Sequence, residues 1–162
     1  MTKSNQKADD DPMSLAFVEA EAAAARGEAP IGAVLVDAKG LVLARSGNRT
    51  EGDSDPTAHA EMLVIRQAAA LRGEPRLPDC VLYVTLEPCA MCAGAIAHAR
   101  LRRLVFAAYD PKGGGVEHGA RVFSRATCHH HPEVIGGVRE GEAGALLKRF
   151  FAQLRNQDSK DE

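Results

Sequence analysis

Residues 81–99 read VLYVTLEPCAMCAGAIAHA. The first six of these residues are apolar with little alternation, which is typical of a strand buried on both faces of a sheet. Glu87 and Pro88 end that strand, and residues 89–99 are rich in alanine and glycine, which favours a closely packed helix. The stretch therefore predicts a strand-to-helix unit of an α/β fold.

Periodic patterns on both sides of this unit predict the remaining elements. Helices are expected at residues 14–26, 58–71 and 141–155, and short strands at 31–36, 41–44, 104–108 and 134–138. Residues 116–133 are hard to assign. The order of these elements predicts a three-layer α/β/α sandwich around a mixed, roughly five-stranded sheet.

The length of 162 residues suits one domain, which we expect at residues 13–157. Residues 1–12 are polar and charged, and we interpret them as a disordered leader, with a polar tail at 158–162. The chain has no apolar run near the roughly 20 residues of a membrane span, and its start lacks the apolar core of a signal peptide. We therefore expect a cytoplasmic protein with no membrane partner.

The formal net charge of −2 hides an asymmetry between the two halves of the chain. Residues 98–157 carry 10 basic and 5 acidic side chains, whereas residues 13–97 carry 7 and 11. A basic second half could contact phosphate groups. An ordinary solvated surface with uneven charge is the alternative interpretation.

Cys89 and Cys92 form a Cys-x-x-Cys pair at the expected start of a helix. A helix N-terminus lowers the pKa of a thiol, and residues three apart lie on one face, so both could bind one metal ion. With His59 as a third ligand, tetrahedral zinc keeps a fourth position for water, as catalytic sites do. Taken alone, the pair could also be a thioredoxin-like redox site.

Glu61 follows His59 by two residues, at the start of an expected buried helix. A carboxylate that lies near metal-activated water without binding the metal can carry protons. The alternative is a glutamate on the helix surface, but residues 62–65 are apolar and burying an unpaired carboxylate would be costly. On a regular helix, residues two apart point about 200° from each other, so His59 and Glu61 would have to converge at the first turn.

The motifs His59-Ala60-Glu61 and Pro88-Cys89-Ala90-Met91-Cys92 resemble those of the cytidine/deoxycytidylate deaminase superfamily. The longer blocks at 55–61 and 85–95 resemble those of bacterial tRNA-specific adenosine deaminases, and the resemblance covers about residues 13–155. It implies a cytidine deaminase-like fold, one Zn²⁺ per subunit, and a homodimer that binds the anticodon loop of a tRNA. It also implies hydrolytic deamination of adenosine to inosine at the wobble position.

Carried over by position, the resemblance implies site residues of three kinds. The metal ligands are His59, Cys89 and Cys92, the proton shuttle is Glu61, and the substrate contacts are Asn48, Ala58, Leu86, Pro88, Asp110, Arg149, Phe150, Phe151 and Arg155. Asn48 could instead be a turn residue. Both phenylalanines lie on the apolar stripe of the last helix, and we expect one to be buried and the other to lie near RNA.

Several features lie outside this pattern or depart from it. The run His129 to His131 could suggest a second metal site, but we expect a surface loop. The loop Gly113 to Gly115, the segment 116–131 and Leu154 depart from the enterobacterial pattern.

Two other functions are compatible with the sequence. A deaminase of free guanine, cytosine or a nucleoside would keep the chemistry and change the substrate. A zinc-containing module that only binds RNA would have no need of Glu61. The basic second half and the aromatic-basic last helix favour an RNA substrate.

Overall fold

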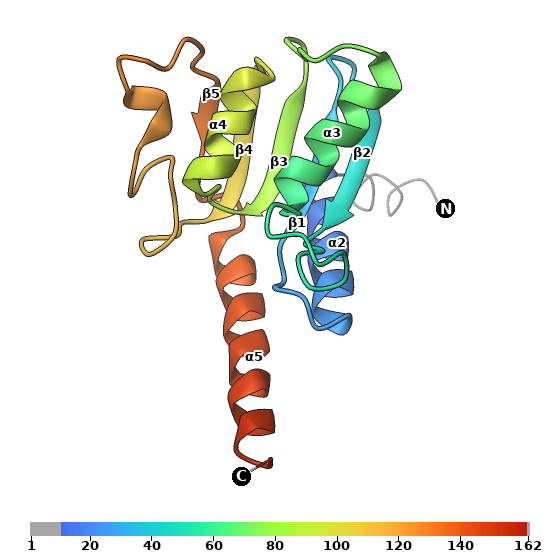
Figure 1. The fold of residues 1–162 in the computed structure, drawn as a ribbon, viewed down its shortest axis with the longest axis vertical. Helices are drawn as coiled ribbons and strands as arrows, with labels where there is room; N and C mark the ends of the chain where they lie inside the picture. The colour runs from blue at the N-terminus through green and yellow to red at the C-terminus, as the bar shows by residue number, and fades with distance from the viewer. Residues whose placement is uncertain (1–10, 162) are drawn as a thin grey trace, which may run out of the picture.

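The computed structural model describes residues 11–161 of the chain. Its elements, in chain order, are α2 (Pro12–Ala25), β1 (Gly32–Val36), β2 (Val42–Gly47), α3 (Ala60–Arg72), β3 (Val81–Leu86), α4 (Ala90–His98), β4 (Arg103–Ala108), the 3₁₀ helix η1 (Val122–Ser124), β5 (Glu133–Ile135) and α5 (Glu140–Asp158), and most are labelled in Figure 1. The strands form one sheet in the order β2-β1-β3-β4-β5. β1 is antiparallel to β2 and β3, whereas β3, β4 and β5 are parallel.

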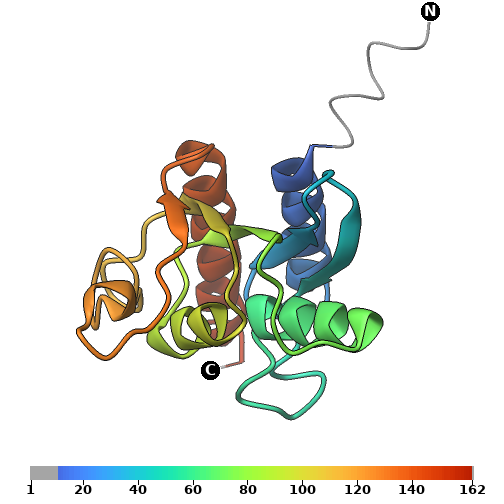
Figure 2. The ribbon, with the colours of Figure 1, turned by 90° about the horizontal axis from the view of Figure 1, so that it is seen from above.

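Helices cover both faces of this sheet, as the view from above shows (Figure 2). α2 and α5 lie on one face, and α3 and α4 lie on the other. Each face has its own hydrophobic core. The predicted three-layer sandwich with a mixed five-stranded sheet is therefore confirmed.

The burial of β1 on both faces shows why the central strands have no polar face. All five of its residues are buried. Ala33 and Leu35 belong to the core beneath α3 and α4, whereas Val34 and Val36 belong to the core beneath α2 and α5. Successive side chains of a strand point to opposite faces, so a strand covered on both sides is apolar throughout.

Two glycines allow α2 to lie very close to the sheet. A Cβ atom at Gly32 would overlap the carbonyl oxygen of Ala16, and one at Gly47 would lie 2.6 Å from the carbonyl oxygen of Glu19. Close backbone approach of this kind requires glycine. The glycines thereby set the distance between α2 and the β1–β2 edge, where the chain continues into the site.

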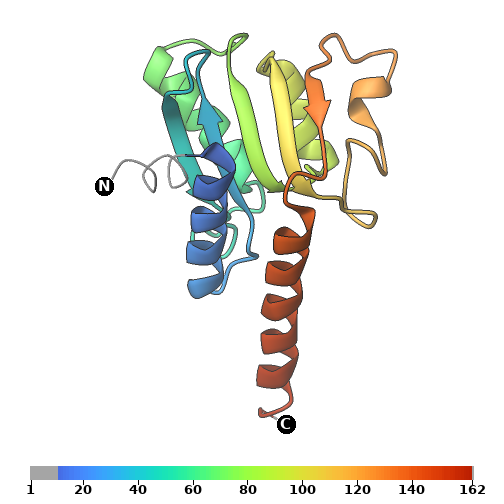
Figure 3. The ribbon, with the colours of Figure 1, turned by 180° about the vertical axis from the view of Figure 1, so that it is seen from behind.

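The C-terminal elements differ in length from the expected ones. β5 spans three residues rather than 134–138, because Gly137 adopts a positive φ of 80° and turns the chain toward α5. α5 is longer than the expected 141–155 and extends well beyond the sheet (Figures 1 and 3). The first residue of the expected tail, Asp158, is the last residue of this helix.

The expected leader falls largely outside the described residues, which begin at Asp11. The carboxylate of Asp11 accepts a hydrogen bond from the Ser14 amide and caps α2, whose first residue is Pro12. The domain limits otherwise remain a prediction. Within residues 11–161, every helix is too short or too polar to cross a bilayer.

Candidate active site

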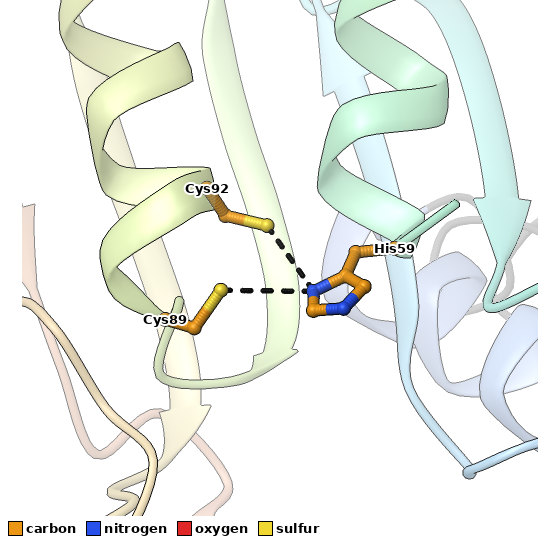
Figure 4. Close-up of side chains that lie close together, drawn as sticks. All are labelled: His59, Cys89 and Cys92. Carbon is orange, nitrogen blue, oxygen red and sulfur yellow. Dashed lines mark hydrogen bonds between the residues drawn. The ribbon is translucent and has the colours of Figure 1, made fainter. Parts of the chain in front are cut away.

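Three side chains from two helix starts converge at one end of the sheet (Figure 4). His59 is the N-cap of α3, Cys89 is the N-cap of α4, and Cys92 lies in the first turn of α4. Nδ1 of His59 lies 3.6 Å from Sγ of Cys89 and 3.5 Å from Sγ of Cys92. All three potential ligand atoms lie within 4.8 Å of one another.

This donor set fits a tetrahedral zinc ion. Zinc binds thiolate sulfur at about 2.3 Å and imidazole nitrogen at about 2.0–2.1 Å, so two such ligands on a tetrahedron lie about 3.5–3.6 Å apart. The two sulfur–nitrogen distances match that separation. Among residues 11–161, only His59, Cys89 and Cys92 form a group of three or more His, Cys, Asp or Glu side chains that could hold a metal ion.

The protonation of the two thiols is strongly unequal. Hydrogen bonds from the Cys92 thiol and from His59 lower the pKa of Cys89 to about 4, although burial opposes the shift. The hydrogen bond to Cys89 and burial raise the pKa of Cys92. Two thiols this close share one proton, so the first ionises easily and the second resists. Of the two thiols, Cys89 therefore ionises more readily to the thiolate, the form that binds metal.

Glu61 lies beside this group on the first turn of α3. It is buried, and desolvation raises the pKa of its carboxyl above the usual range. Glu61, His59 and Cys89 all line one cavity of about 230 Å³. A carboxyl at this place in the cavity is suited to giving and taking protons.

His59 and Glu61 converge because His59 is not in the helical conformation. As the N-cap of α3, it has φ −71° and ψ 148°, which is extended backbone. The rotation of about 100° per residue of a regular helix therefore does not separate the two side chains. Both line the same cavity, as their roles would require.

Asn48, directly after β2, is attached to the same helix start. Its Oδ1 accepts a hydrogen bond of 2.9 Å from the amide of Ala60, the first residue of α3. Arg26 donates from Nη2 to the carbonyl oxygen of Asn48 at 3.2 Å. Oδ1 of the buried Asn48 thus accepts within the protein, and Asn48 is not among the residues that line the cavity shared by His59 and Glu61.

A second, larger cavity of about 600 Å³ adjoins the first. The two share Ile31, Leu86 and Asp110 as lining residues. α5 contributes Leu147, Lys148, Phe151 and Arg155 to the larger cavity. The inner cavity is lined by two of the three potential metal ligands, His59 and Cys89, and the outer one is aromatic and basic.

The substrate contacts expected on α5 lie on two different faces of that helix. Phe151, whose side chain is 47% exposed, lines the outer cavity with Arg155. Phe150 is buried. Arg149 lies instead beside Glu21 and Leu146 in a groove between α2 and α5.

Four of the expected positions and one unexpected residue remain to be placed. Leu86 and Asp110 line both cavities. Ala58 and Pro88 are buried and line neither. Sequence reasoning missed Glu87, which lines the inner cavity and is fully buried. The signal was present, because a carboxylate directly after a buried strand needs internal partners.

Of the three histidines at positions 129–131, one forms a hydrogen bond with the rest of the fold. Nε2 of His130 lies 2.6 Å from the carbonyl oxygen of Leu101, while His129 and His131 are exposed. These three histidines therefore form no cluster of their own.

Comparison with known proteins agrees with this geometry. The family model described as MafB19-like deaminase matches residues 7–155. The tRNA-specific adenosine deaminase of Agrobacterium fabrum is 57% identical over 146 residues, which cover 90% of this chain and 95% of that protein. A solved structure from a study of A-to-I editing by tRNA:A34 deaminases at the wobble position of transfer RNA is 58% identical, with a TM-score of 0.82 over 84% of this chain and 98% of that one.

A guanine deaminase structure from Bacillus subtilis is more distant, at 39% identity and a TM-score of 0.58 over 60% of this chain and 62% of that one. On the extent of the family match and the identity over nearly the whole length of its relative, the chain belongs to the MafB19-like deaminases and, among them, to the tRNA-specific adenosine deaminases.

Proposed function

We propose that this protein deaminates adenosine to inosine at the wobble position of a tRNA anticodon. One observation carries the proposal: a cavity with a His-Cys-Cys group and a buried glutamate opens beside a second cavity lined by aromatic and basic side chains. The first has the groups for hydrolytic deamination, and the second has groups that hold single-stranded RNA.

In this proposal His59, Cys89 and Cys92 hold one zinc ion per subunit. A zinc ion with three protein ligands supplies a water molecule whose pKa is lowered to about 7. Glu61 would take a proton from the water that adds to C6 of adenine and pass it to N1. It would then carry the remaining hydroxyl proton to the amino group, which leaves as ammonia while C6 becomes the carbonyl carbon of inosine. The raised pKa of Glu61 supports this role, because the carboxyl must hold the proton between the two transfers.

Asn48 and Asp110 would orient the target nucleotide. While Oδ1 of Asn48 accepts from the Ala60 amide, its NH₂ group would donate to an acceptor atom of the base. Asp110 lies at the junction of the two cavities and would face the sugar. Leu86 and Ile31 would contact the apolar faces of the nucleotide in the same region.

Neighbouring nucleotides would occupy the outer cavity. Phe151 offers a half-exposed ring for stacking, and Lys148 and Arg155 offer positive charge for phosphates. A base in an anticodon loop is already partly unstacked, so flipping it into the inner cavity costs little. We further propose that the protein acts as a homodimer in the cytoplasm, where tRNA is modified.

The experiment that tests the function compares inosine formation on an anticodon stem–loop with adenosine at the wobble position against free adenosine, guanine and cytidine. We expect inosine in the stem–loop only. Glu61→Gln should retain zinc and lose roughly 10²–10⁴-fold in rate, the usual contribution of a general acid–base. Rapid turnover of a free base, with none on the stem–loop, would show a small-molecule deaminase instead.

A further inference from the structure

Glu87 is a fully buried carboxylate for which the mechanism above has no use. It lies between the end of β3 and the start of α4, two residues before Cys89. Its side chain has 0% exposure, and its backbone amide donates to the carbonyl oxygen of Ala108. A charge buried to this degree is retained only when internal donors replace its water.

Five hydrogen bonds provide that replacement, and all come from residues 110–118. Oε1 accepts from the Asp110 amide at 3.1 Å and from Nδ1 of His118 at 2.8 Å. Oε2 accepts from the amides of Val116, Glu117 and His118 at 3.1–3.2 Å. Because a carboxylate only accepts, Nδ1 of His118 carries the proton. One carboxylate therefore binds both ends of the loop.

The loop has other attachments as well: the Gly115 carbonyl oxygen accepts from the Val122 amide at 2.9 Å, and Val116 is buried in the core beneath α3 and α4. Residues 110–118, all in the described part of the chain, form neither helix nor strand. One further attachment is the Gly115 amide, which donates to the Pro88 carbonyl oxygen at 2.8 Å. A Cβ atom at Gly114 would overlap Oε2 of Glu87, so glycine there allows the backbone to approach the carboxylate.

Two residues of this loop line the inner cavity together with His59 and Cys89. Asp110 and Gly113 line that cavity. Oδ1 of Asp110 accepts from the amides of Lys112 and Gly113, so the direction of its side chain depends on the conformation of the loop. His118 also contacts Tyr109 edge-on, with ring centroids 6.1 Å apart, and Tyr109 lines the outer cavity.

We propose that Glu87 is the positioning residue of the substrate-facing loop 110–118 and, through it, of the wall that Asp110 presents to the nucleotide. The activity part of this proposal rests on the proposed function, whereas the structural part does not. Glu87 touches neither substrate nor metal in this role. It acts through backbone amides that a neutral side chain could not satisfy together.

The test is amide hydrogen exchange of the zinc-loaded protein, comparing wild type with Glu87→Gln. The amide side chain keeps the volume but replaces one acceptor oxygen with a donor that faces backbone N–H groups. We expect protection of the amides of residues 110 and 116–118 to fall by at least about tenfold, while α3 and α4 keep theirs. Glu117→Gln is the matched control, since its side chain is exposed and only its backbone amide takes part.

Steady-state kinetics on the stem–loop give the second readout. Glu87→Gln should raise KM about tenfold or more and change kcat less, with zinc content unchanged; Glu117→Gln should match wild type. If wild type does not act on the stem–loop, the proposed function fails, and hydrogen exchange still decides the role of Glu87. Gly114→Ala should displace the loop from the Glu87 carboxylate while Glu87 keeps its charge. This variant replaces Glu87→Gln in the exchange experiment if Glu87→Gln does not fold. Unchanged protection at 116–118 in whichever of the two variants folds would overturn the proposal.

Discussion

Replacing Phe151 with alanine should weaken RNA binding without weakening the fold. Phe151 is 47% exposed as a residue and lines the outer cavity, whereas its neighbour Phe150 is buried. An exposed side chain of this kind contributes within about 0.5 kcal/mol to stability. For a protein of this size, that is a change in Tm of roughly 2 °C or less.

The loss of binding follows from the stacking that the ring can provide. Removing an aromatic platform costs about 1–3 kcal/mol per stacked base. At about 1.4 kcal/mol per tenfold, the Kd for the stem–loop should rise roughly 5- to 150-fold. Arg155→Ala should remove one phosphate contact and reduce the salt slope of binding by about 1.

Arg149 provides the matched comparison, because it lies two residues from Phe151 and points to another side of α5. It lines the groove against α2 near Glu21, not the outer cavity. Its removal should change the Kd less than about twofold, since surface charges away from the contact are largely screened. The sequence alone groups Arg149 with Arg155, so this comparison separates the structural argument from the sequence argument.

Fluorescence anisotropy of a labelled anticodon stem–loop measures these effects at several salt concentrations. All variants should be made in the Glu61→Gln background, so that the RNA is not converted during the titration. The reasoning is refuted if Arg149→Ala weakens binding as much as Phe151→Ala does. It is equally refuted if Phe151→Ala binds as tightly as its parent.

Two further predictions concern the metal group and a surface ion pair. Cys89→Ala and Cys92→Ala should each lose zinc and stability, because metal binding is linked to folding, whereas Cys128→Ala should keep its zinc in elemental analysis. Asp79 pairs with Arg72, and this hydrogen bond holds the pKa of the carboxyl well below its usual 3.8. The stabilisation from a lowered carboxyl pKa is present above the pKa of the unfolded chain and is lost as the pH falls through the pKa of the folded protein. Asp79→Asn should therefore lower the free energy of unfolding at pH 7 by about 1 kcal/mol or less. In thermal melts, the difference from wild type should shrink below about pH 4.

The sequence by itself was sufficient to predict the three layers of the fold and the three potential metal ligands. Residues 104–108 are apolar throughout and Val81–Leu86 nearly so, without alternation, so two-sided burial could be inferred before any contact was known. The spacing of Cys89 and Cys92 at a helix start is likewise a local property. Short-range periodicity carries information of this kind, because it reflects which faces of an element are covered.

Only the tertiary structure decided which groups distant in the chain lie together and form hydrogen bonds. His59 and Glu61 share a cavity because the chain at His59 is extended, and the amide of Ala60 is capped from Asn48, twelve residues away. Glu87 binds donors 23–31 residues later, and Phe151 and Arg149 separate only once α5 packs against α2 and β4. Sequence periodicity does not predict such pairs, because the hydrogen-bond partner of a buried polar group is set by the fold and not by distance along the chain.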